Sequence, residues 1–153
     1  ELGNRAIPAE RPTELKIAIS AESLFASLPK DLRRSLGDVP AVVRTLQDRA
    51  HAAREQIEKL NAVLEGSGSG ARASDKRDAL TSDVKSARSD AEKRLSELVT
   101  ALETVRLDLL RLQAGIGSQE SITQDLAAAA AVGKDADRLI AALSEADSAL
   151  KKR

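Results

Sequence analysis

Apolar residues recur at alternating spacings of three and four residues through most of the chain from Ala41 onward. The first such run consists of Val43, Leu46, Ala50, Ala53, Ile57, Leu60 and Leu64. This spacing places all of its members on one stripe of an α-helix, as in coiled coils. We therefore predict an all-α fold: an elongated antiparallel helical bundle or coiled coil. It would contain three long helices, short N-terminal helices and one short isolated strand.

Two further runs predict the second and third long helices. The second run is Leu80, Val84, Ala87, Ala91, Leu95, Leu98, Leu102, Val105, Leu109 and Leu112. Its two consecutive four-residue steps around Ala91 form a stutter, which locally unwinds a left-handed supercoil. The third run is Ile122, Leu126, Ala129, Val132, Ala136, Leu139, Leu143, Ala146 and Leu150. Gly133 interrupts this helix, and we expect a kink or a close helix approach there.

The remaining boundaries follow from turn and capping residues. Residues 1–20 are predicted to form an irregular lead with a short strand at Thr13–Ser20, where Leu15, Ile17 and Ile19 alternate with neighbours on the other face. Residues 21–37 would form a short helical cap, with Ser20 as its N-cap. The first long helix is predicted at 38–65, the second at 71–114, and a turn with the third at 115–153. Asp38 and Ser118 suit helix starts, and Gly37 suits a helix end.

Residues 66–70 read Gly-Ser-Gly-Ser-Gly and are predicted to be a linker. A pure Gly/Ser pentapeptide between charged helical segments is typical of an engineered connection that replaces a longer loop or helical tip. A natural turn is the alternative. The chain starts at Glu1 and contains no Met, which favours a fragment, a processed product or an engineered chain.

Composition excludes several classes of protein. The 24 basic and 24 acidic residues balance, and Phe25 is the only aromatic residue, so we expect no nucleic-acid partner. There is no cysteine, which excludes disulfides and thiolate metal sites and is compatible with a cytoplasmic location. No apolar stretch approaches the length of a membrane span, so membrane contact is disfavoured.

No residue pattern predicts catalysis, a metal or a cofactor. His51 is the only histidine, and its nearest acid in sequence is Asp48, so we expect a surface role for it. Several acids have basic neighbours at helical spacing, which indicates solvated ion pairs such as Glu103–Arg106 and Asp108–Arg111. The segment from Gly115 to Glu120 lacks the Lys of a phosphate-binding loop. We therefore expect a non-enzymatic chain without cofactors.

The unequal lengths of the predicted helices favour self-association. The three helices would span roughly 37, 60 and 50 Å, so they cannot cover one another fully. Apolar stripes left open invite a second chain, and we predict a homodimer, with a different protein partner also possible. The predicted contact residues are Leu15, Ile17, Ile19, Leu95, Leu98, Leu102, Leu107 and Leu110. The strand would pair with a copy, pair with a further domain, or lie as an arm on the helices.

Two stretches of the sequence resemble a region found in a known family of proteins. One runs from Ser27 to Arg44, and the other from Arg106 to Leu126 and on into Asp137-Arg-Leu-Ile. They resemble the helical accessory region that follows the catalytic domain of some bacterial serine/threonine protein kinases. The resemblance implies a cytoplasmic module that dimerises a kinase or holds a partner. No kinase signature is present, so no catalytic residue is carried over.

Three other functions compete with this interaction module. A scaffold or membrane-surface helical bundle would need a continuous basic face, which the interspersed acids oppose. An enzyme with a site inside the bundle would need clustered inward polar residues, which the apolar runs lack. A designed scaffold would fit the Gly/Ser linker, but the irregular lead, the stutter and Gly133 indicate a natural origin.

Overall fold

Helices make up nearly all of the chain that the computed structural model describes, which comprises residues 12–67 and 75–151, with side chains for 12–66 and 77–135. In order, the helices are α1 (Thr13–Ser27), α2 (Lys30–Leu36), α3 (Val39–Ser67), α4 (Asp75–Gln113) and α5 (Gln119–Lys151). The predicted all-α class and the helical bundle are confirmed. The irregular lead before Pro12 and positions 68–70 of the predicted Gly/Ser linker lie outside the described residues.

The predicted strand at Thr13–Ser20 is wrong, because these residues form the first half of α1. The alternation of Leu15, Ile17 and Ile19 covers only three apolar positions. A helical stripe runs further along the same segment, through Ile17, Ala18, Ala21, Leu24, Phe25 and Leu28. No Gly or Pro separates the predicted strand from the start of the predicted cap, so α1 continues from one into the other and ends at Ser27. Ser20 therefore lies inside α1 and caps nothing.

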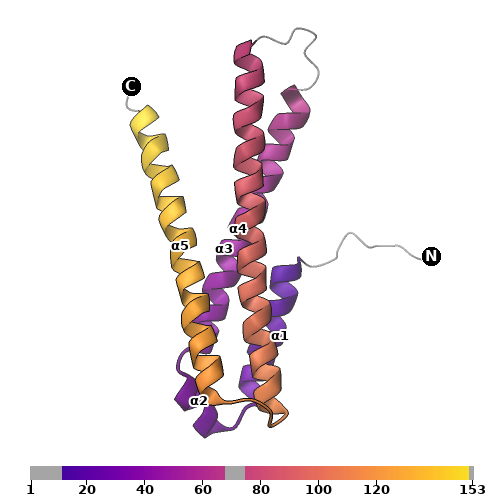
Figure 1. The fold of residues 1–153 in the computed structure, drawn as a ribbon, viewed down its shortest axis with the longest axis vertical. Coiled ribbons are helices and arrows are strands. Elements are labelled where there is room, and N and C mark those ends of the chain that lie inside the picture. The colour runs from indigo at the N-terminus through magenta and orange to yellow at the C-terminus, as the bar shows by residue number, and fades with distance from the viewer. Residues whose placement is uncertain (1–11, 68–74, 152–153) are drawn as a thin grey trace, which may run out of the picture.

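Four helices share the core at the α2 end of the molecule. Figure 1 shows α3 and α4 as a central antiparallel pair, with α1 on one side, α5 on the other and α2 across the end. Both α1 and α5 pack against both members of the central pair. The bundle was predicted to consist of three long helices, and α1 packs against it as a fourth helix.

The core follows the predicted apolar stripes. In α3 the buried members are Val43, Leu46, Ala50 and Ala53; in α4 they are Ala91, Leu98, Leu102, Val105 and Leu109; in α5 they are Ile122, Leu126 and Ala129. Ala18 and Ala21 of α1 are equally buried. Alanines at these positions bring helix backbones close together, so the chain packs a core with almost no aromatic side chains.

The N-caps of α3 and α5 and the turn after α4 form where the sequence predicts them. The amide of Ala41 donates to Asp38 Oδ1 at 3.2 Å, and the amide of Ser121 donates to Ser118 Oγ at 3.2 Å, so both residues are N-caps. After α4, Gly115 adopts φ 77°, and the amide of Ile116 donates to the carbonyl of Arg111 at 2.8 Å. This hydrogen bond, with Gly115 in the left-handed region, forms a Schellman cap that reverses the chain into α5.

Gly133 marks a close helix approach, as predicted. A Cβ atom at this position would lie 3.3 Å from Thr45 Cγ2 of α3. Above this contact α5 diverges from α4, and above the start of α1 the α3–α4 pair continues as a two-helix hairpin (Figure 1). The molecule is therefore closed by four helices at one end and open at the other.

Candidate functional site

A buried ion pair joins α1 to α3. Glu14 lies in the first turn of α1 and is 1% exposed. Arg54 of α3 donates from Nε to both carboxylate oxygens, at 3.2 and 3.0 Å, and from Nη2 to Oε1 at 2.8 Å. Burial acts to raise the pKa of Glu14, but the hydrogen bonds and charge of Arg54 outweigh it and hold the pKa below its ordinary value. Such a carboxylate stays ionised and fixes the position of α1 instead of exchanging protons.

His51 stands beside this pair at the surface. Its Nδ1 lies 3.9 Å from Glu14 and its Nε2 lies 3.7 Å from Glu55, while its side chain is more than half exposed. The expected surface role agrees with this placement, although the neighbouring acids are Glu14 and Glu55 instead of Asp48. The Glu14–Arg54 pair was not predicted, because in a strand Glu14 would lie on the face opposite Leu15, Ile17 and Ile19. Helical spacing from Glu14 to Ala18 and Ala21 is the signal that would have revealed it.

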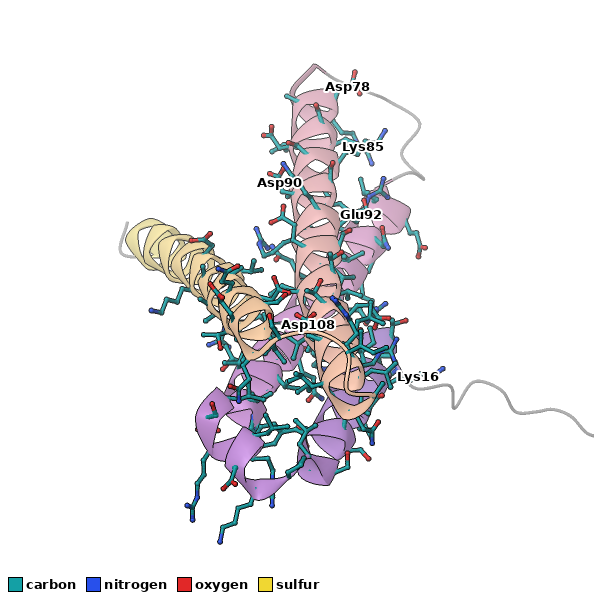
Figure 2. All side chains as sticks on the ribbon, turned by 60° about the horizontal axis from the view of Figure 1, so that its bottom comes forward. Lys16, Asp78, Lys85, Asp90, Glu92 and Asp108 are labelled. Atoms are coloured by element: carbon teal, nitrogen blue, oxygen red, sulfur yellow. The ribbon has the colours of Figure 1, made fainter. Side chains whose placement is uncertain are left out.

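A second polar site lies where α4 meets α5. Asp108, which is labelled in Figure 2, is 7% exposed and faces Asp125 across this contact. Burial, followed by the hydrogen bond and the charge of Asp125, raises the pKa of Asp108 to about 6. Arg111 lies 3.8 Å away and opposes this shift only in part. Within the described residues, Asp108 Oδ2 has no hydrogen-bond partner.

This placement corrects the expected solvated Asp108–Arg111 pair. Arg111 is in range of Asp108, but the carboxyl group itself is inside the α4–α5 contact, because α5 covers that face of α4. The Glu103–Arg106 pair, by contrast, forms as predicted, with Arg106 Nη2 2.6 Å from Glu103 Oε1. The cavity beside Asp108 has a volume of only about 10 Å³, which leaves no room for a substrate.

A groove opens between α4 and α5 beside Asp125, with a volume of about 330 Å³. Its floor is apolar and is formed by Ala101, Ala128, Ala129 and Val132. Its rim carries Glu97, Thr100, Thr104 and Asp125. None of the described residues that line it is basic. The groove therefore combines an apolar floor with acidic edges.

Two other grooves flank α3. One lies where α3 approaches Gly133 and is lined by small and aliphatic residues of α3 and α5 together with Lys134, with a volume of about 280 Å³. The other begins where α1 starts, has a volume of about 470 Å³, and is lined in part by Ile57, Leu95 and Val99. This second groove exposes the apolar stripes of α3 and α4 at the point where α1 no longer covers them.

The eight predicted contact residues differ in how far they are exposed. Leu98 and Leu102 are fully buried in the chain's own core, and Ile17 and Leu95 pack against that core. Leu15 is half-buried, whereas Ile19, Leu107 and Leu110 are 45%, 44% and 42% exposed. Leu107 and Leu110 share the outer side of α4, while Ile19 belongs to α1. Only part of the predicted set is therefore accessible to another chain.

No group of three or more His, Cys, Asp or Glu residues that could hold a metal ion occurs in the described residues. No helix in that part of the chain is long and apolar enough to cross a membrane. Neither a known family model, nor a curated protein, nor a solved structure matches this chain.

Proposed function

We propose that this chain is a non-catalytic helical interaction module that self-associates through the open half of its α3–α4 hairpin. The observation that supports this most directly is the exposure of apolar residues there. Val63 of α3 is 53% exposed and Leu80 of α4 is 58% exposed, although both belong to or adjoin apolar stripes. Both side chains lie where the cover by α1 and α5 has ended, so a further helix could bury them.

A second copy of the chain is the partner that fits this surface. At the α2 end, α1 and α5 cover the two sides of the α3–α4 pair, and this cover is missing further along. Two hairpins packed about a twofold axis would supply the missing helices to each other. The open half of α4 carries both signs of charge, with Asp78, Lys85, Asp90 and Glu92 spaced along it in Figure 2, so like copies can approach.

Light scattering coupled to size exclusion tests this proposal. We expect the wild-type chain to show twice the monomer mass at high concentration and V63K/L80K to remain monomeric, because buried lysines would be unpaired in the interface. The matched control, L107K/L110K, places the same charges on the accessible side of α4 at the closed end and should still dimerise. A monomeric wild-type chain would refute self-association. Loss of the dimer only in the control would move the interface to Leu107 and Leu110.

We further propose that such a module sets the geometry of an attached domain. The two stretches that resemble a bacterial serine/threonine kinase accessory region support a cytoplasmic kinase as that domain. A helical dimer holds whatever is joined to it at a defined distance and orientation. In a longer protein that contains both parts, V63K/L80K should reduce autophosphorylation between copies while leaving phosphorylation of a free peptide unchanged.

A further inference from the structure

We infer that the α4–α5 groove binds an amphipathic helix of a partner protein, whose apolar stripe is flanked by Lys or Arg residues about two turns apart. This inference rests on the proposed function as an interaction module and names a second partner class for it. The groove differs from the self-association surface, because it lies between α4 and α5 near the closed end.

The length of the groove fits a helix. Its lining residues extend from Ser96 to Thr104 along α4 and from Asp125 to Val132 along α5. At 1.5 Å per residue these stretches span about 10–12 Å, or two helical turns. A helix laid along them would present side chains at positions i, i+3, i+4 and i+7, which is the usual arrangement of helix-in-groove recognition.

The floor of the groove selects the apolar side of the partner. Ala101, Ala128 and Ala129 have short side chains, so a partner helix can place Leu or Ala side chains close to both backbones. Ala128 is exposed, whereas Ala129 is buried beneath it. The floor therefore offers apolar contact that the chain's own helices leave uncovered.

The acids at the rim select the charge of the partner. α4 and α5 run in opposite directions (Figure 1), and Glu97 and Asp125 each lie near the start of the stretch that lines the groove on their helix, so the two acids lie toward opposite ends of the groove. Glu97 is seven residues from Thr104, the α4 lining residue at the Asp125 end, or about 10 Å along the helix, which matches basic residues at positions i and i+7 of one partner helix. Because no described lining residue is basic, no positive charge in the groove repels a cationic partner.

Binding of a labelled peptide tests this inference. The probe is an 18-residue helical peptide with a Leu/Ala stripe and Lys at i and i+7, and its matched control has Glu at both positions. Fluorescence anisotropy with the full chain should give a micromolar Kd for the Lys peptide and at least about tenfold weaker binding for the Glu peptide. Equal affinity for both peptides, or no binding of the Lys peptide, would overturn the inference.

Two variants of the protein locate the binding site. E97K reverses one rim charge, and A128W fills the groove at an exposed position without changing charge. Each should weaken binding of the Lys peptide about five- to tenfold. E22K makes the same charge change on the exposed surface of α1 and should leave the Kd unchanged. Unchanged binding in both groove variants would overturn the assignment, and circular dichroism melting would verify that both fold.

Light scattering on the same samples separates this inference from the proposed function. If the chain dimerises but binds neither peptide, the proposed self-association stands and the groove is not a binding site. If the chain binds the Lys peptide but remains monomeric, the groove is a binding site and the proposed self-association is wrong.

Discussion

Two carboxyl groups, Glu14 and Asp108, are buried in the described core, and their surroundings drive their titration in opposite directions. Arg54 holds the pKa of Glu14 below its ordinary value. The stability that Glu14 contributes is therefore present above its ordinary pKa of 4.5 and is lost as the pH falls through the lower folded-state value. This pair ties α1 to the bundle most firmly near neutral pH.

Asp108 behaves in the opposite way. Its pKa of about 6 in the folded chain lies above the ordinary value of 3.8, so the folded state binds the proton more tightly. The stability contributed by protonated Asp108 is fully present below pH 3.8 and is lost as the pH rises through 6. At neutral pH the ionised group faces Asp125 and weakens the contact between α4 and α5.

The substitution D108N should remove this dependence. Because Asn resembles the protonated acid, we expect wild type and D108N to be equally stable near pH 3, where the acid is protonated in both states. At pH 7.5 the variant should be more stable by about 2–3 kcal/mol. Urea unfolding at both pH values measures this difference. D90N, at an exposed position of α4, serves as the control and should show no such change. A D108N effect that is the same at both pH values would contradict the raised pKa.

At the scale of elements, α5 can approach α3 closely because Gly133 has no side chain. An Ala here would favour the helix by about 1 kcal/mol, but its Cβ would lie 3.3 Å from Thr45 Cγ2. These two effects oppose each other. The position of α5 therefore depends on one glycine that intrinsic helix propensity alone would disfavour.

A paired substitution separates the two effects. G133A alone should change the free energy of unfolding by less than about 0.5 kcal/mol, because helix propensity and crowding offset each other. G133A/T45S, which removes the crowding methyl group, should stabilise the chain by about 0.5–1 kcal/mol relative to T45S. Urea unfolding of all four proteins measures the coupling. Additive effects of the two substitutions would show that α5 does not approach α3 as described.

At the scale of the whole molecule, stability should decrease from the closed end to the open end. The α2 end has a core shared by four helices, whereas the far part of the hairpin has only two. Backbone amides open most easily where few apolar contacts hold the helices. The open half is thus both the less stable part and the proposed interface.

Hydrogen exchange should show this gradient and its dependence on concentration. In dilute protein we expect slow exchange for amides in 43–53 and 98–109, and exchange at least about tenfold faster in 58–66 and 77–90. Self-association should slow the second group as concentration rises and leave the first group unchanged. Uniformly slow exchange along the hairpin in dilute protein would contradict an open end.

Sequence patterns alone predicted the stripes of α3 and α4 and the N-caps of α3 and α5. Val43 to Ala53 and Leu98 to Leu109 are buried as their spacing requires, and Asp38 and Ser118 cap their helices. These features depend on neighbours within one or two turns, so local sequence is sufficient. The strand prediction for Thr13–Ser20 was wrong because three alternating apolar residues are compatible with a strand and with a helix. Only the continuation of the stripe to Leu28 distinguishes them.

Periodicity and composition by themselves determined that this chain forms helices that bury apolar stripes, and where most of those helices start and stop. Tertiary structure decided which acids are buried, because Glu14 and Asp108 differ from other acids only in what packs over them. It also decided that Leu98 and Leu102 belong to the chain's own core while Leu107 and Leu110 stay accessible. The reason is physical: helical spacing gives a residue its side of the helix, but burial and pKa depend on which other helix covers that side.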